Sequence, residues 1–141
     1  MNKLSRDYLD NEAIFYGCSI KEKRFCEQAY KAFAKNGIKL YPVGNLKDES
    51  FSFKVYKDLD ELPKIPSFAH IVSGKDETRK IIKRLHELGI KKILFNSKNC
   101  VDEDTLKDCE KMGMQTLVAC PMMILGSGPC RLHAFFAGVK R

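Results

Sequence analysis

The chain contains 141 residues, of which 44% are hydrophobic and 30% are charged, proportions typical of a single soluble domain with its own core. No apolar run approaches the ~20 residues of a membrane-spanning helix, and residues 1–12 lack the apolar stretch of a secretory signal, so we expect a cytoplasmic protein. The net charge of +7 favours an anionic partner such as a nucleotide. Because the basic residues are scattered along the chain, direct recognition of nucleic acid is disfavoured.

The cysteine and histidine pattern argues against a metal site. The six cysteines stand at positions 18, 26, 100, 109, 120 and 130, and the three histidines are far apart, so the spacing does not match a zinc site. In a reducing compartment we expect free thiols, most of them small buried hydrophobic groups. Cys18 and Cys120 stand apart because each lies beside the end of a predicted strand.

The first half of the chain alternates between short apolar runs and helical periodicity. The apolar run at residues 13–16 predicts a strand buried on both faces, and the spacing in residues 25–36 predicts a helix that ends at Gly37. The next segments are predicted as a strand, a surface loop, a short strand and a helical turn capped by Asp58, at residues 38–43, 47–53, 54–56 and 58–62.

The second half repeats the alternation of strands and helices. Strands are predicted at residues 69–72, 92–95 and 115–119, and helices open at Asp76 and Asp102. Strands that alternate with helices of about 10–15 residues indicate successive βαβ crossovers and a parallel sheet. The sequence therefore predicts one three-layer, doubly wound, Rossmann-like α/β domain over residues 1–141, with an N-terminal extension at 1–11 and a C-terminal segment at 122–141 packed on it.

Small or polar residues follow each main predicted strand. In an open parallel sheet, ligands bind beyond the carboxyl ends of the strands, where the strand order reverses. The candidate residues at these ends are Gly17, Cys18, Ser19, Val43, Gly44, Asn45, Ser73, Gly74, Asn96, Ser97 and Cys120. Their clustering at strand ends predicts a ligand site at this edge of the sheet.

The loop after the first strand is the strongest candidate for binding phosphate. Gly17 allows a tight turn, Ser19 offers a hydroxyl, and the amides at the start of the next helix can meet a phosphate. Lys21 and Arg24 add positive charge there. The G-x-G-x-x-G fingerprint is absent, and Lys47 rather than an acidic residue stands near the end of the second strand. These features favour a cofactor with a ribose phosphate, such as coenzyme A or NADP, over NAD.

Four short segments follow a known pattern in order and spacing. Residues 17–24 read GCSIKEKR against G-A-S-x-x-P-x-R, and residues 42–45 read PVGN against P-V-N-P. Residues 55–63 read VYKDLDELP against V-Y-x-S-L-x-D-L-P, and residues 120–122 read CPM, where the pattern has a cysteine before apolar residues. Over roughly residues 12–125 the chain thus resembles the small CoA-binding proteins with a Rossmann-like fold, which are related to the CoA-binding domain of the succinyl-CoA synthetase α subunit.

The resemblance implies how coenzyme A would lie. Its diphosphate would lie near Gly17, Ser19, Lys21 and Arg24. Its adenosine would lie toward Val43, Gly44, Asn45 and Lys47. The pantetheine arm would pass Ser73, Gly74, Asn96 and Ser97, and its thiol would approach Cys120.

Three functions stay open at this point. The first is a non-catalytic module that binds CoA or an acyl-CoA, because no Ser-His-Asp, Cys-His or paired-carboxylate arrangement can be placed on the ligand side. The second is an NAD(P)-binding oxidoreductase subunit, which would need a homodimer or a partner subunit to complete its site. The third is a redox or ligand sensor that acts through a partner protein.

Overall fold

The structure is a computed structural model that describes residues 8–19, 23–44 and 51–121. The strands within these residues are β1 (Glu12–Tyr16), β2 (Lys39–Val43), β3 (Phe68–Ile71), β4 (Lys92–Phe95) and β5 (Gln115–Val118). The helices are α1 (Lys23–Lys35), α2 (Lys75–Glu87) and α3 (Glu103–Lys111), with the short 3-10 helix η2 (Leu59–Glu61) before β3. The strands form one all-parallel sheet in the order β2-β1-β3-β4-β5, which confirms the predicted α/β class.

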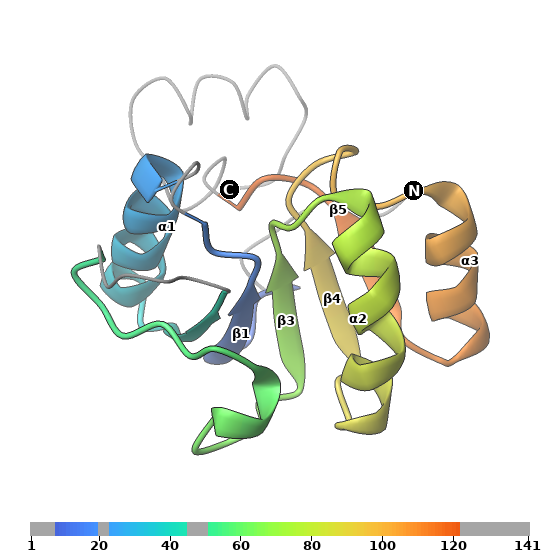
Figure 1. Cartoon of the computed structure of the whole chain (residues 1–141), viewed down its shortest axis with the longest axis horizontal. Helices are drawn as coiled ribbons and strands as arrows, with labels where there is room; N and C mark the ends of the chain where they lie inside the picture. The colour runs from blue at the N-terminus through green and yellow to red at the C-terminus, as the bar shows by residue number, and fades with distance from the viewer. Residues whose placement is uncertain (1–7, 20–22, 45–50, 122–141) are drawn as a thin grey trace.

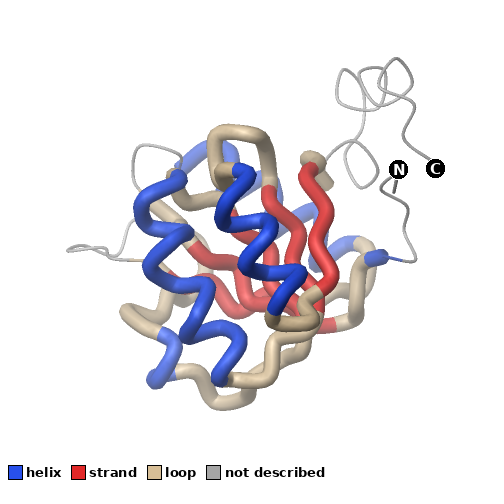
Figure 2. Tube along the Cα trace, turned by 90° about the vertical axis from the view of Figure 1, so that its right-hand side faces the viewer, coloured by secondary structure: helices blue, strands red, loops and turns tan. Residues whose placement is uncertain are grey.

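Helices cover both faces of the sheet. Alternate residues of each strand point to opposite faces, and the apolar side chains on each face are buried by helices. On one face, Cys26 and Phe33 of α1 pack in a cluster with Phe15 of β1. On the other face, Leu85 of α2 and Cys109 of α3 belong to a second cluster. Figure 1 shows α1 apart from α2 and α3, and Figure 2 shows α2 and α3 side by side in front of the sheet. The fold therefore has the three predicted layers.

The segment at residues 54–56 was predicted as a strand, and this prediction is wrong. Only Tyr56 pairs with the sheet, in an isolated parallel bridge to Val43. Its N–H donates to the carbonyl of Pro42 (2.8 Å), and its carbonyl accepts from the N–H of Gly44 (3.0 Å). The pairing stays short because the chain turns into η2 three residues later and leaves the edge of the sheet.

Capping residues set the starts of the helices, with one difference from the prediction. The carboxylate of Asp58 caps η2, and that of Asp102 accepts from the N–H of Thr105 at the start of α3, both as predicted. Asp76 does not open α2. The N-cap is Gly74, in an extended conformation, and Asp76 lies in the first turn, where its charge favours the helix dipole.

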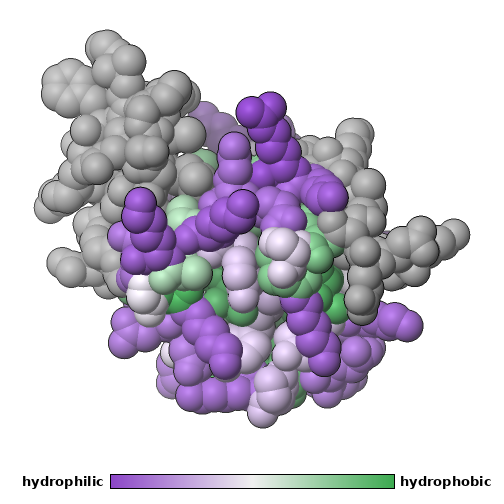
Figure 3. Space-filling model, turned by 90° about the vertical axis from the view of Figure 1, so that its left-hand side faces the viewer, coloured by the Kyte–Doolittle hydropathy of each residue, from purple (hydrophilic) through white to green (hydrophobic). Residues whose placement is uncertain are grey.

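The segment beside the β2 edge packs on α1 through aromatic rings. The ring centroids of Tyr30 and Phe53 are 4.2 Å apart, and those of Phe51 and Phe53 are 5.1 Å apart. Ser52 also donates its backbone N–H to the carboxylate of Glu27 (3.0 Å). The space-filling view from this side shows a mostly hydrophilic surface with apolar side chains between the polar ones (Figure 3).

Part of the predicted N-terminal extension belongs to the core. Tyr8 and Leu9 are buried in the cluster on the α1 face, and the Tyr8 hydroxyl donates to the carbonyl of Ile93 (2.9 Å). Lys92 and Asp10 form an ion pair of 2.9 Å beside them. The predicted C-terminal segment at residues 122–141 lies outside the described residues. Among the helices that the structure describes, none has the length and apolar character to cross a membrane.

Candidate ligand site

The order of the strands reverses between β1 and β3. These strands are neighbours, but the chain leaves β1 for β2 on one side and leaves β3 for β4 on the other. The connecting helices α1 and α2 cover opposite faces, so the loops at the carboxyl ends of β1 and β3 diverge. Such a divergence opens a crevice in which doubly wound proteins bind their ligands.

Two glycines let three loops meet at this edge. Gly17 has a φ of +109°, and a Cβ at this position would lie 2.5 Å from the backbone nitrogen of Ser73. A Cβ on Gly44 would collide with the carbonyl oxygen of Cys18. The N–H groups of Gly17 and Cys18 both donate to the carbonyl of Val43, at 2.9 and 3.2 Å. The chain itself requires both glycines, because the loops could not otherwise come so close.

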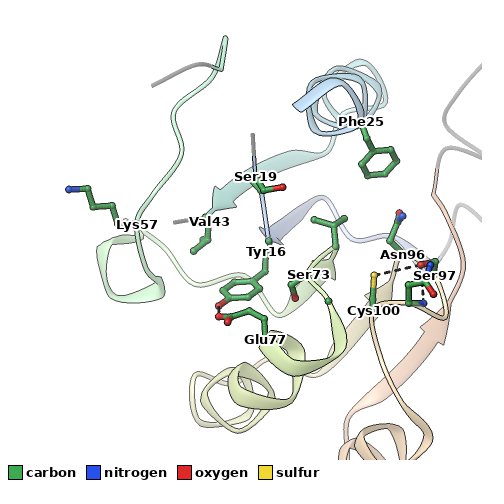
Figure 4. Close-up of a pocket in the computed structure, with 16 residues that line it drawn as sticks. Tyr16, Ser19, Phe25, Val43, Lys57, Ser73, Glu77, Asn96, Ser97 and Cys100 are labelled. Carbon is green, nitrogen blue, oxygen red and sulfur yellow. Dashed lines mark hydrogen bonds between the residues drawn. The ribbon is translucent and has the colours of Figure 1, made fainter. Parts of the chain in front are cut away.

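A cavity of about 960 Å³ opens beyond these loops, and its size is typical of a site for a small ligand (Figure 4). The residues that line it are Tyr16, Gly17, Cys18, Ser19, Phe25, Val43, Gly44, Lys57, Val72, Ser73, Gly74, Glu77, Asn96, Ser97, Asn99 and Cys100. They come from the ends of β1 to β4, from the first turns of α1 and α2, and from the segment before η2.

Most of the described residues that the sequence predicted for the site line this cavity. These residues are Gly17, Cys18, Ser19, Val43, Gly44, Ser73, Gly74, Asn96 and Ser97. Two predicted residues lie elsewhere: Arg24 is exposed on α1, and Cys120 is partly buried against the α1-side core. Lys21, Asn45 and Lys47 lie outside the described residues.

Sequence reasoning missed several lining residues. Tyr16, Phe25, Lys57, Glu77 and Cys100 line the cavity but were not predicted for it. A local signal existed for some of them, because Tyr16 is the last residue of a predicted strand and Glu77 lies in the first turn after Gly74. No local pattern in the sequence marks Lys57 or Phe25.

Tyr16 and Glu77 join the two sides of the crevice. The Tyr16 hydroxyl donates to Oε1 of Glu77 at 2.6 Å, and Figure 4 shows the two side chains meeting on one wall of the cavity. Desolvation, together with the hydrogen bond and charge of Glu77, raises the pKa of Tyr16 well above its usual value. The phenol therefore stays protonated at neutral pH and holds the Glu77 carboxylate in place.

The start of α2 forms another wall. Gly74 is its N-cap and supplies no side-chain oxygen to the amides of the first turn. The hydroxyl of Ser73 is instead paired with that of Thr78, at 2.9 Å, and both residues are buried. The first N–H groups of a helix lack partners within the helix, so this end of α2 presents donors and a positive dipole toward the cavity.

The end of β4 forms the opposite wall. Asn96 lies there with its Oδ1 3.1 Å from Nε2 of His70, a residue of β3 that is fully buried. The hydroxyl of Ser97 accepts from the N–H of Asn99 (3.2 Å) and contacts Sγ of Cys100 (3.8 Å). Ser97 is thus engaged within its own turn, while Asn96 connects the cavity to the core.

The described cysteines form no disulfide with one another, and most of them are buried. A hydrogen bond with Cys26 and burial raise the pKa of Cys18 far above its usual value. Burial, with the charge of Asp108, raises the pKa of Cys109 to about 11. Neither thiol is activated as a nucleophile, because the reactive form is the thiolate. Within the described ranges, no group of three or more His, Cys, Asp or Glu side chains could hold a metal ion.

The fold and the cavity define a doubly wound α/β domain with an open cavity at its topological switch point. The sequence matches the CoA binding domain family over residues 12–126, and the protein belongs to this family. A comparison with curated proteins finds no match.

Solved structures share the fold. A hypothetical protein from Pyrococcus horikoshii OT3 superposes with a TM-score of 0.69 at 20% identity, over 82% of this chain and 80% of that one. A conserved hypothetical protein from Pyrococcus furiosus has a TM-score of 0.69 at 23% identity, over 82% and 98% of the two chains. A protein from Thermus thermophilus has a TM-score of 0.68 at 13% identity, over 85% and 92%.

Proposed function

We propose that the protein binds coenzyme A, free or as an acyl-CoA, in the cavity at the carboxyl ends of β1 and β3. One observation carries the proposal: a member of the CoA binding domain family has an open cavity of about 960 Å³ at the switch point of its sheet. Ligands of doubly wound proteins bind at this place. The volume suits a long ligand that lies across several strand ends.

The lining supports a ligand with both anionic and apolar parts. The uncapped start of α2 at Gly74 favours an anion, because its amides and dipole face the cavity. Lys57 adds an exposed cation on one side, and Phe25 offers an apolar ring on another. Coenzyme A combines phosphate groups with a long arm in which methyl and methylene groups alternate with amides, so its chemistry fits this lining.

In the proposed arrangement the diphosphate lies near Gly17 and Ser19, and the adenosine lies toward Val43 and Gly44. The predicted contributions of Lys21, Asn45 and Lys47 stay part of this proposal. The arm passes the start of α2 and then the end of β4. Its thiol end lies toward Cys100, a lining residue, rather than toward Cys120.

The proposed role is non-catalytic, as a carrier or a regulatory module in the cytoplasm. The raised pKa values of Cys18 and Tyr16 keep both groups protonated, which suits neither a thiolate nucleophile nor a phenolate base. We include in the same proposal that ligand binding acts on a second copy of the chain, in a homodimer, or on a partner subunit.

A second candidate is a dinucleotide, NAD or NADP, bound by an oxidoreductase subunit. Glu77 favours this reading, because a carboxylate in the cavity can accept hydrogen bonds from a ribose diol. Its hydrogen bond from Tyr16 occupies only one of its oxygens.

Calorimetric titration with CoA, acetyl-CoA, NADH and NADPH separates the candidates. We expect CoA and acetyl-CoA to bind more tightly than either dinucleotide. Lys57→Ala should weaken CoA binding by about twofold to fivefold, as for a solvent-exposed charge pair. Lys107→Ala, which removes an exposed cation of α3 outside the lining, is the matched control and should leave the affinity unchanged. Binding of NADH or NADPH alone would contradict the proposal.

A further inference from the structure

His70 is an imidazole enclosed in the apolar centre of the sheet. It belongs to β3 and has no exposed surface. Its ring stacks on Phe15 with 5.2 Å between centroids and lies against Phe33 at 5.5 Å. Desolvation lowers the pKa of His70 to about 4, so the ring is neutral near pH 7. A polar ring in such surroundings is costly unless a hydrogen bond compensates for its burial.

The hydrogen bond of His70 has one favoured direction. Nε2 lies 3.1 Å from Oδ1 of Asn96, and Nδ1 is buried without a partner among the described residues. If Nε2 carries the proton, it donates to Asn96 and only a lone pair on Nδ1 is unsatisfied. In the reverse arrangement the Asn96 amide would donate to Nε2, and a buried N–H at Nδ1 would have no acceptor. Orphaned buried N–H groups are the rarer and costlier case, so Nε2 is the donor.

This direction determines what Asn96 offers to the cavity. Its Oδ1 is occupied by His70, which leaves the NH₂ group, a double donor, for the cavity that Asn96 lines. Among the described residues, no side chain or backbone group accepts from this NH₂. The neighbouring hydroxyl of Ser97 already accepts from the N–H of Asn99. Figure 4 shows Asn96 beside Ser97 and Cys100, near the ring of Phe25.

We propose that His70 is a positioning residue: by donating from Nε2 to Oδ1, it fixes the Asn96 amide so that its NH₂ group binds an acceptor oxygen of the ligand. This step rests on the proposed function for the identity of the ligand. In coenzyme A the acceptors are the amide carbonyls of the arm and the phosphate oxygens. The place of Asn96, beyond the start of α2 on the β4 side, favours a carbonyl of the arm.

The positioning role is tested first without any ligand. Nitrogen-15 NMR of the histidine rings in the ligand-free protein reports which ring nitrogen carries the proton. We expect His70 in the Nε2–H form, and we expect Asn96→Leu to change its ring shifts. An Nδ1–H tautomer, or shifts that ignore Asn96→Leu, would overturn the inference whether or not CoA binds.

A double-mutant cycle on CoA affinity then tests the link to the ligand. Asn96→Leu removes the donor and should weaken CoA binding about tenfold, the value of one neutral hydrogen bond. His70→Phe keeps a stacked ring but leaves Asn96 free to rotate, and should weaken it by about threefold to tenfold. The double variant should bind no more weakly than Asn96→Leu alone, since His70 acts through Asn96. Additive losses would contradict this.

Two further measurements identify the role of the donor nitrogen and the ligand group that accepts the hydrogen bond. His70→Gln retains a donor nitrogen near the place of Nε2 and should restore the affinity to within about twofold of the wild type. The fragment 3′-phosphoadenosine 5′-diphosphate keeps all the phosphates of coenzyme A but lacks the pantetheine arm. A loss seen with CoA but not with this fragment assigns the acceptor to a carbonyl of the arm, and an equal loss with both assigns it to a phosphate. If the wild type binds no CoA, the proposed function fails, and the NMR measurement still decides the role of His70.

Discussion

The hydroxyl of Tyr16 donates a hydrogen bond of 2.6 Å to Oε1 of Glu77 across the point where the strand order reverses. Tyr16 ends β1, and Glu77 lies in the first turn of α2, which follows β3. The pair therefore ties together the two elements that diverge to form the crevice. Because both side chains line the cavity, a ligand there would contact a wall that the protein has already fixed.

Tyr16→Phe should lower the free energy of unfolding at neutral pH by about 1 kcal/mol, because Tyr16 is partly buried while its partner Glu77 is exposed. The folded-state pKa of Tyr16 lies above its usual value of 10.0, so its contribution is present below pH 10 and is lost as the pH rises through the folded-state pKa. Urea unfolding at neutral and alkaline pH measures both effects. Tyr30→Phe, which keeps the stack on Phe53, is the control and should change the stability little.

Gly17→Ala should destabilise the protein more than Gly37→Ala. Both glycines have a positive φ, of 109° and 76°, so alanine is strained at either position. A Cβ at residue 17 would also strike the backbone of Ser73, whereas a Cβ at residue 37 meets nothing within 4 Å. We expect a cost of about 1 kcal/mol at Gly37 and about 2 kcal/mol or more beyond that at Gly17. Urea unfolding measures both losses of stability. Equal losses in the two variants would contradict the prediction, because they would show that the loops at Gly17 and Ser73 move apart at little cost.

His70 should make the protein less stable in mild acid. Its folded-state pKa of about 4 lies below the ordinary 6.5, so between these values the unfolded chain binds a proton that the folded chain does not. Stability therefore falls as the pH drops from 6.5 toward 4, by roughly 3 kcal/mol for this group. His70→Phe should flatten this part of the profile, measured by urea unfolding across that range.

His86→Gln is the control for this pH profile. His86 is exposed near the end of α2, so its replacement removes an imidazole without disturbing the core around His70. A slope that is unchanged in His70→Phe would show that another group causes the loss.

The sequence predicts the strand ends well but not the contacts between them. The runs that end at Gly17, Gly44 and Gly74 are local patterns, and the corresponding loops meet at the cavity. The pairs Tyr16–Glu77 and His70–Asn96 join residues 61 and 26 positions apart. Their proximity depends on the strand order, which local periodicity does not specify.

Two residues predicted for the site, Arg24 and Cys120, lie outside the lining of the cavity for geometric reasons. Arg24 lies one residue after the start of α1 and is exposed, while its neighbour Phe25 lines the cavity. Cys120 follows β5, the edge strand, which β4 separates from the crevice between β1 and β3. The sequence pattern marks the end of every strand in the same way. In the described part of the structure, only the strand ends near the switch point line the cavity.

The most direct test of the account is a CoA titration of two variants at Gly74. This residue has an ordinary extended backbone, and a Cβ there meets nothing within 4 Å, so a side chain can begin at this position without a clash. Gly74→Phe would place a bulky ring at the lining of the cavity, while Gly74→Ala adds one methyl group and leaves the first amides of α2 uncapped. If coenzyme A binds in this cavity, calorimetry will show Gly74→Phe at least about tenfold weaker than the wild type, and Gly74→Ala within about threefold. Equal CoA affinity in the wild type and in both folded variants would contradict the account.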